Sequence, residues 1–223
     1  MMRALIFDFD GLILDTEAPI FQAWQEIYQA HGGELTIQEW STIIGSNEFA
    51  FDPLQRLAAQ TGYPLDSQAL LTRQRQRETE LIAQQPVMPG VAEYLRDARQ
   101  LGLKIGLASS SPCGWVTGHL SRLGLVHYFD CIMASDDVRR TKPDPELYLT
   151  VLSVLDVHPS EAFALEDSPN GIRAAKQAGL FCVAVPNLLT RQMDTSLADL
   201  HLNTLTDLSL ESLLERITSL QRS

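Results

Sequence analysis

Five short segments of the chain are almost entirely apolar, and their spacing limits the folds that the chain can adopt. They cover Ala4–Phe7, Lys104–Ala108, Cys131–Ala134, Ala162–Leu165 and Phe181–Val185. A strand buried on both faces of a parallel sheet has this continuous apolar pattern, whereas a half-exposed strand alternates apolar and polar residues. Amphipathic segments lie between the runs. The order of elements therefore predicts a doubly wound, parallel-sheet α/β core with right-handed crossovers.

Proline and glycine mark the expected ends of the helices between these strands. An N-cap residue precedes proline in three places, Ser111-Pro112, Asp144-Pro145 and Ser168-Pro169. Proline is favoured at the first helical position, where its missing N–H would have no partner anyway. Glycine follows three of the expected helices, at Gly102, Gly124 and Gly179. Glycine readily adopts the left-handed conformation that ends many helices.

The segment after the first strand has no convincing strand pattern. It predicts four helices, over Glu17–His31, Ile37–Ile44, Asp52–Thr61 and Ser67–Gln84. We expect residues 15–86 to form a small helical bundle inserted as a cap, and residues 1–14 and 87–223 to form the α/β core. The insertion point lies at the end of a strand, where open α/β sheets bind ligands. The alternative, that these helices pack rigidly against the sheet, stays open.

Composition narrows the classes of partner. The chain has 17 Lys and Arg against 28 Asp and Glu, a net charge of −11, and 45% hydrophobic residues. The apolar content excludes disorder as the main state. The acid excess argues against a protein that binds nucleic acid or an anionic membrane, since both need basic surface. An anionic substrate would need positive charge supplied locally.

Cysteine usage and hydropathy bear on location. Cys113, Cys131 and Cys182 are odd in number and lack C-x-x-C spacing, so they predict neither a disulfide framework nor a zinc site. The N-terminal apolar run is too short for a signal peptide, and no run approaches the roughly 18 apolar residues of a membrane span. We expect a cytoplasmic protein that binds no membrane. Without a coiled-coil pattern or an apolar surface stripe, we expect a monomer.

Two acids directly follow the first predicted strand. Asp8 and Asp10 are two positions apart, so continued extended geometry would place both carboxylates on one side. Two such carboxylates repel each other, so one must hold a proton or a cation must lie between them. Acid pairs at strand ends are also common as solvated turn residues. The pair alone therefore does not decide between a site and a turn.

A hydroxyl residue and a lysine follow later strands. Ser109 comes directly after the second strand, where hydroxyl and backbone N–H groups ahead of a helix suit phosphate oxygens. Ser110 is a candidate substrate contact, and we expect Ser111 to cap the helix. Lys142 precedes Pro143, which restricts its backbone. Although lone lysines are usually solvated, this one could offset carboxylates and phosphate at the edge of the sheet.

Further acids follow the strand at Ala162–Leu165. Glu166 and Asp167 would lie at the same edge of the sheet as Asp8 and Asp10. Hard oxygen ligands without a nearby His or Cys favour Mg²⁺ over zinc. Asp167 would be a third carboxylate beside Asp8 and Asp10, so the sequence predicts a magnesium site at this edge.

These motifs together resemble those of a known family. Their order, Asp8/Asp10, Ser109, Lys142 and Glu166/Asp167, is similar to the four motifs of haloacid dehalogenase (HAD) superfamily hydrolases of the β-phosphoglucomutase-like group. The residues 8–17, Asp-Phe-Asp-Gly-Leu-Ile-Leu-Asp-Thr-Glu, resemble the first motif of that group. The resemblance spans essentially the whole chain, including the helical insertion. It implies a HAD-like Rossmannoid core with an α-helical cap.

The resemblance also implies roles for these residues. Asp8 would attack the phosphorus of a phosphate monoester and form an aspartyl-phosphate. Asp10 would protonate the leaving group and then activate water. Mg²⁺ would be held by the Asp8 carboxylate, the Asp10 backbone carbonyl and Asp167, with Glu166 orienting a metal-bound water. Ser109 would bind a phosphoryl oxygen, and Lys142 would neutralise negative charge.

Two positions separate a phosphatase from a sugar phosphomutase. The mutases carry a histidine and an arginine where this sequence has Ile20 and Glu48. An acid at a second phosphate position is unfavourable by Coulomb repulsion. We therefore predict Mg²⁺-dependent hydrolysis of a small phosphorylated metabolite such as a sugar phosphate, with Glu17, Asn47 and Ser110 contacting the substrate. The alternatives are a phosphomutase, a phosphoacceptor signalling module and a non-catalytic binding protein.

Overall fold

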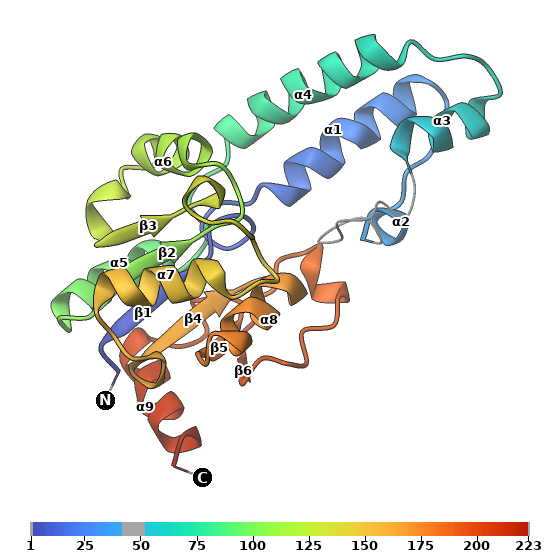
Figure 1. Cartoon of the computed structure of the whole chain (residues 1–223). Coiled ribbons are helices and arrows are strands. Elements are labelled where there is room, and N and C mark those ends of the chain that lie inside the picture. Colours follow the sequence, from blue (N-terminus) through green and yellow to red (C-terminus); the bar gives the residue numbers. More distant parts are fainter. Residues whose placement is uncertain (1, 42–51, 223) are drawn as a thin grey trace.

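A six-stranded parallel sheet forms the centre of the molecule (Figure 1). The computed structural model describes residues 2–41 and 52–222. The strands are β1 (Ala4–Phe7), β2 (Lys104–Ala108), β3 (Cys131–Met133), β4 (Ala162–Glu166), β5 (Phe181–Ala184) and β6 (Leu200–His201). Their order is β3-β2-β1-β4-β5-β6. The five predicted strands are present with ends within one residue, and β6 was not predicted.

The strand order places the first strand at the centre of the sheet. Ala4 pairs with Lys104 of β2 on one side and with Ala162 of β4 on the other. The chain therefore winds outward from β1 in one direction and from β4 in the other. Ligands of open α/β sheets bind beyond the carboxyl ends of the strands at such a reversal. The predicted doubly wound parallel fold is confirmed.

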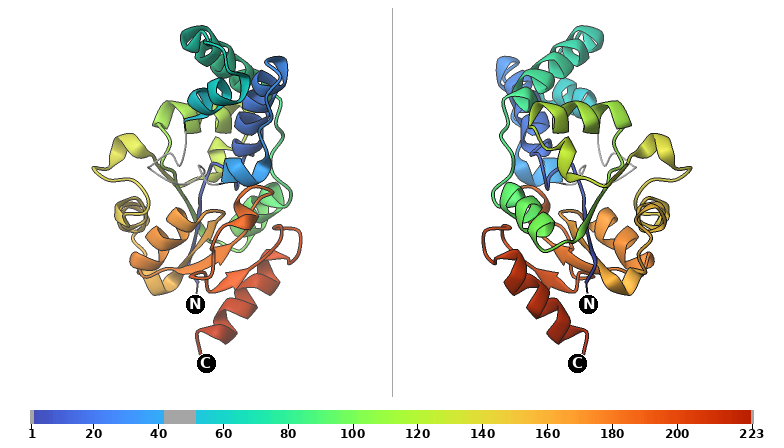
Figure 2. Two further views of the ribbon diagram at one scale, coloured as in Figure 1. Left: turned by 90° about the vertical axis from the view of Figure 1, so that its right-hand side faces the viewer. Right: turned by 90° about the vertical axis from the view of Figure 1, so that its left-hand side faces the viewer.

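Helices cover both faces of this sheet (Figure 2). They are α5 (Val91–Gln100), α6 (Cys113–Arg122), α7 (Glu146–Leu155), α8 (Pro169–Gln177) and α9 (Leu210–Leu220), with short 3₁₀ turns at Val126–Tyr128, Ser135–Asp137, Pro159–Glu161 and Thr190–Gln192. Leu5 and Phe7 pack with α5, α6 and α9 in one apolar cluster, while Ala4 and Ile6 pack with α7 and α8 in another. Both faces of β1 are thus buried, which explains its continuous apolar sequence.

Most of the predicted helix ends are confirmed. Ser168 accepts a hydrogen bond from the N–H of Gly171 and caps α8, and Gly102, Gly124 and Gly179 have φ angles of 71°, 71° and 82°. The predicted starts at Ser111 and Asp144 are wrong, because Pro112 and Pro145 occupy the N-cap positions and α6 and α7 begin at Cys113 and Glu146. The Ser111 side chain turns toward the first motif instead.

Of the helices described between β1 and β2 in the chain, the four that precede α5 extend beyond the carboxyl ends of the strands (Figure 1). They are α1 (Glu17–Ala30), α2 (Ile37–Ser41), α3 (Pro53–Thr61) and α4 (Ser67–Ala83). The rest of the predicted second helix, beyond residue 41, lies outside the described residues. Trp24, Ile27 and Tyr28 of α1 share an apolar cluster with Leu57 and Leu70. The inserted helical layer predicted from sequence is present, and its domain boundaries stay a prediction.

The two connections between the sheet and these helices lie side by side. Leu14 forms an antiparallel bridge with Val87, and the N–H of Met88 donates to the carbonyl of Ile13 at 2.9 Å. The two crossings are therefore hydrogen-bonded to each other. Among residues 2–41 and 52–222, every helix is too short or too polar to cross a bilayer.

Candidate active site

Asp8 and Asp10 leave the central strand into a tight turn. The Asp8 N–H donates to the carbonyl of Leu165 at 3.0 Å, which extends the pairing of β1 with β4 past the last strand residue. Gly11 then turns the chain with a φ of 82°. A Cβ at Gly11 would lie 2.2 Å from Oδ2 of Asp167. Glycine is required here both for the backbone conformation and for the close approach of β4.

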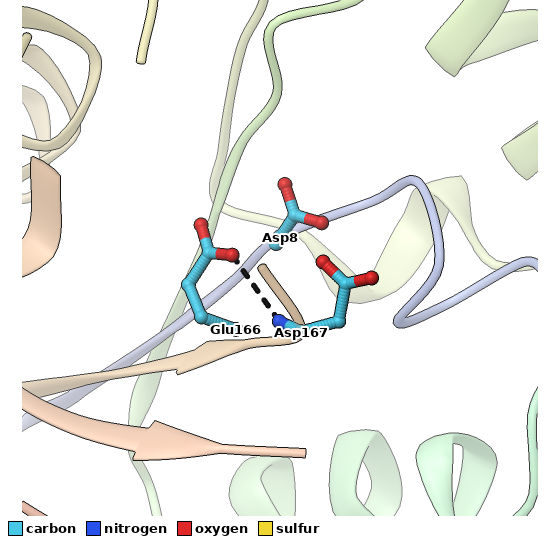
Figure 3. Close-up of side chains that lie close together, drawn as sticks. All are labelled: Asp8, Glu166 and Asp167. Carbon is cyan, nitrogen blue, oxygen red and sulfur yellow. Dashed lines mark hydrogen bonds between the residues drawn. The ribbon is translucent and has the colours of Figure 1, made fainter. Parts of the chain in front are cut away.

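Three buried carboxylates gather at the carboxyl ends of β1 and β4 (Figure 3). Asp8, Glu166 and Asp167 each offer one oxygen, and these oxygens lie within 4.8 Å of one another. Asn187, after β5, donates to Oδ2 of Asp167 at 2.8 Å. Burial raises the pKa of Asp8 from 3.8 to about 8, and burial together with Asp8 and Glu166 raises the pKa of Asp167 well above its usual value. A divalent cation would relieve this repulsion, so the oxygen donor set fits Mg²⁺.

Lys142 is buried against two of these acids. Its Nζ lies 2.5 Å from Oδ1 of Asp8 and 2.6 Å from Oε1 of Glu166. Burial alone would lower the pKa of Lys142, but the two carboxylates raise it above its usual value. Lys142 is therefore charged, and it supplies positive charge inside an acidic molecule.

Both oxygens of the Glu166 carboxylate accept hydrogen bonds. Its Oε1 also accepts a hydrogen bond from the hydroxyl of Tyr148 at 2.6 Å, and its Oε2 accepts one from the N–H of Asp167 at 3.2 Å. A Cβ at Gly171 of α8 would lie 2.0 Å from the Glu166 carboxyl group. Because Oε1 already serves Lys142 and Tyr148, Glu166 fixes the lysine. Its predicted action on a metal-bound water stays a prediction.

The Asp10 carboxylate is hydrogen-bonded to residues of the β2–α6 connection and of α6. Its Oδ2 accepts hydrogen bonds from the hydroxyls of Ser111 at 2.6 Å and Ser109 at 3.3 Å. Its Oδ1 accepts one from Nε1 of Trp115 at 3.0 Å. The assignment of Ser111 to helix capping is corrected here, because its hydroxyl serves Asp10.

A cavity of about 620 Å³ lies between the sheet and the inserted helices. Its lining includes Asp8, Asp10, Lys142, Asp167, Ser110, Ser111 and Trp115 from the core and Glu17, Ile20 and Glu78 from the helices. Of the predicted substrate contacts, Glu17 and Ser110 lie in this lining, and Asn47 lies outside the described residues. Burial raises the pKa of Glu17 from 4.5 to about 7, and Asp10, Asp15 and Glu78 add to the effect.

Sequence reasoning missed four residues that contact the predicted site. Asn187 follows the carboxyl end of β5, as the predicted site residues follow other strands, and that position could have identified it. Ser111 has a hydroxyl in the same run as Ser109, but its place before Pro112 is explained equally well by helix capping. Tyr148 and Trp115 are aromatic residues on helices, and their sequence pattern is that of ordinary core residues.

Comparisons with known proteins agree with this geometry. The family model described as "Haloacid dehalogenase-like hydrolase" matches residues 5–185. The chain is 44% identical to "Putative phosphatase YhcW" of Bacillus subtilis (strain 168) over 98% of this chain and 99% of that protein. It is 34% identical to "Phosphorylated carbohydrates phosphatase" of Thermotoga maritima, over 80% and 82% of the two chains.

A solved structure extends the comparison to the fold. The crystal structure of "putative beta-phosphoglucomutase" from Thermotoga maritima matches with a TM-score of 0.78 and 30% identity, and covers 96% of this chain and 99% of that one. The match includes the inserted helices, because it spans nearly the whole chain.

Proposed function

The chain belongs to the haloacid dehalogenase-like hydrolase family, as a phosphatase, and from that premise we propose that it hydrolyses a small phosphate monoester through a covalent intermediate on Asp8. One observation carries the proposal. The buried Asp8 carboxylate lines the cavity beside the charged Lys142 at 2.5 Å, and the second acid, Asp10, lines it as well. Nucleophile, charge partner and proton donor thus share one cavity.

Asp8 is suited to attack phosphorus. An in-line displacement at a phosphate needs a nucleophile that is positioned, and charge that offsets the phosphate oxygens. Lys142 supplies that charge at Asp8, and Glu166 with Tyr148 fixes Lys142. The Asp8 oxygen forms a bond to phosphorus while the bond to the leaving oxygen breaks.

Asp10 is suited to proton transfer. Its carboxylate lies outside the three-acid group and lines the cavity, where it can protonate the leaving oxygen. That step leaves Asp10 in its basic form, ready to take a proton from the water that hydrolyses the intermediate. One residue can therefore serve both half-reactions. The Ser109 hydroxyl, 3.3 Å from Asp10, would bind a phosphoryl oxygen after rotating.

The donor set supports Mg²⁺ as the cofactor. Asp8 and Asp167 would hold the ion with their carboxylates, Asp10 with its backbone carbonyl, and Asn187 would orient Asp167. When bound, the ion supplies charge neutralisation for the phosphate and its leaving group.

The charges of the cavity support a substrate with a single phosphate. Among the described residues that line it, Lys142 is the only Lys or Arg, and residues 42–51 contain neither. Glu17 and Glu78 would repel a second phosphate, while their oxygens can accept hydrogen bonds from hydroxyl groups. We infer a sugar or polyol monophosphate, in keeping with the Thermotoga relative's name. A phosphomutase ranks second. The solved neighbour's name supports it, but a mutase must bind a bisphosphate, which the acids of this cavity would repel.

Activity of matched variants tests the proposal. The wild-type protein should release phosphate from sugar monophosphates with Mg²⁺, and Asp8→Asn should release none. Mass spectrometry of the wild-type protein quenched in acid during turnover should show a phosphate adduct on the peptide that contains Asp8. Turnover at the wild-type rate in Asp8→Asn would refute the nucleophile. Isomerisation of a sugar phosphate through a bisphosphate would favour the mutase.

A further inference from the structure

The Asp10 carboxylate is held by donors that the proposed reaction does not by itself require. Ser111 donates its hydroxyl to Oδ2 at 2.6 Å, and Trp115 donates its indole N–H to Oδ1 at 3.0 Å. Each oxygen of the carboxylate therefore has a partner from the β2–α6 segment. Two partners on opposite oxygens fix the plane of a carboxylate, whereas one partner leaves it free to rotate.

Trp115 is itself fixed in place. It lies in the first turn of α6 and lines the cavity, and its ring contacts His119 edge-on, with ring centroids 4.4 Å apart and an interplanar angle of 72°. An aromatic side chain has few rotatable bonds, so packing on a neighbour restricts it. The indole N–H therefore reaches Asp10 from a rigid support.

The two donors differ in what they allow. An indole N–H can only donate, whereas a serine hydroxyl can donate or accept. The Asp10 Oδ1, which faces Trp115, must therefore remain an acceptor. The Oδ2 atom, which faces Ser111, can carry a proton that the hydroxyl accepts or releases.

We propose that Trp115 is a positioning residue that, together with Ser111, selects the Asp10 oxygen that exchanges the proton with the leaving group. This inference rests on the proposed function. As Asp8 bonds to phosphorus, the electron pair of the breaking P–O bond stays on the leaving oxygen. That oxygen takes the proton from Oδ2 of Asp10, which returns to the carboxylate form. Trp115 contributes by orientation alone and exchanges no proton.

Esters with different leaving groups provide the test. An alkoxide must be protonated as it leaves, whereas p-nitrophenolate leaves without a proton, so only the alkyl ester depends on Asp10. Because kcat/KM reports only the steps up to formation of the aspartyl-phosphate, the rate of hydrolysis of that intermediate does not affect it. In Trp115→Phe, kcat/KM for a sugar monophosphate should fall about 10-fold or more, part of the ~10²–10⁴-fold supplied by a positioned acid. For p-nitrophenyl phosphate it should change less than about 2-fold.

Two comparisons separate positioning from damage to the fold. Trp24→Phe, in the apolar cluster of the inserted helices, should leave both esters unchanged. In an Asp10→Asn background, Trp115→Phe should cause no further fall for the sugar monophosphate. An equal fall for both esters, no fall for either, or a further fall in that background would overturn the proposal. A wild-type protein that hydrolyses neither ester would refute the proposed function, and the inference with it.

A spectroscopic measurement checks the hydrogen bond without activity. The chain has three tryptophans, so a ¹H–¹⁵N spectrum should contain three indole N–H signals. The signal absent from Trp115→Phe is that of Trp115. In Asp10→Asn this signal should move upfield, because a neutral amide is a weaker acceptor than a carboxylate, while the other two stay. An unmoved signal would overturn the proposal.

Discussion

The single positive charge of Lys142 pairs with two buried acidic side chains. Its ammonium group lies within 2.6 Å of both Asp8 and Glu166, and all three side chains are buried. A buried charge that loses its partner is costly, because water cannot replace the lost interaction. The lysine thus supports the fold of the site as well as its chemistry.

Lys142→Met tests both contributions. It leaves the buried Glu166 carboxylate without a cation, so in the absence of Mg²⁺ we expect a loss of about 3–5 kcal/mol of unfolding free energy at pH 7, together with loss of phosphatase activity. Urea denaturation measures the change. Lys176→Met removes a half-exposed pair with Asp199 and should cost about 0–1 kcal/mol. Equal losses in the two variants would contradict the buried-pair account.

Glu17 gives a pH-dependent contribution. Its pKa rises from 4.5 to about 7 on folding, so between these pH values the folded state holds more protons than the unfolded state. Stability from this group is fully present below pH 4.5 and is lost as the pH rises to 7.

Glu17→Gln should remove this loss. The variant should be more stable than the wild type at pH 8, by about 1–3 kcal/mol, and closer to it at pH 5. Urea denaturation at both pH values measures the difference. Glu93→Gln, at an exposed position, should change stability by less than about 0.5 kcal/mol at either pH. A Glu17→Gln effect that does not depend on pH would contradict the assignment.

At the scale of residues, the positions of charges that follow a strand are predictable from sequence, while their roles stay predictions. The ends of parallel strands converge, and the structure places Asp8, Lys142 and Asp167 close together. The position of Ser111 is not predictable in this way, because a hydroxyl beside a helix start can serve either the backbone or a distant carboxylate. Only the folded chain determines which partner is nearer.

At the scale of elements, the close approach of α8 to β4 shapes the site. Gly171 lies against the Glu166 carboxyl group, and Glu166 cannot move away because Lys142 and Tyr148 hold it. The strand patterns and most helix ends were predictable from local sequence. The two-residue β6 was not, because so short a strand has no pattern of its own.

Gly171→Ala should therefore be harmful although alanine favours helices. Its Cβ would lie 2.0 Å from the Glu166 carboxyl group, so we expect lower thermal stability and loss of phosphatase activity. The matched change Gly118→Ala in α6 meets nothing within 4 Å and should stabilise by about 0.5–1 kcal/mol. If both variants were stabilised, Glu166 would have to be mobile.

At the scale of the whole molecule, the buried acids at the carboxyl ends of β1 and β4 make the stability of the metal-free protein depend on pH. Burial raises the pKa values of Asp8 and Asp167, so the metal-free protein gains protons there on folding. The contribution of Asp8 to the stability of the metal-free protein is therefore lost as the pH rises from 3.8 to about 8. A bound cation needs the deprotonated carboxylates and competes with these protons.

Mg²⁺ should therefore stabilise the protein more at about pH 8.5 than at about pH 6, because the pKa of Asp8 in the folded protein lies between these values. Thermal melting with Mg²⁺ and with a chelator measures the difference at each pH. Asp167→Asn should remove most of the Mg²⁺-dependent shift at both pH values. An equal shift at the two pH values, or one that survives in Asp167→Asn, would count against this site.

The central place of β1 has a consequence for biosynthesis. The strand that precedes Asp8 is made before both of its neighbours, which begin at residues 104 and 162. Loop closure over such distances is slow, and a nascent chain lacks both neighbours of this apolar strand until residue 104 and one of them until residue 162. Asp8 and Asp10 therefore leave the ribosome long before Lys142 and Asp167. A product truncated before β4 would contain Asp8 and be inactive.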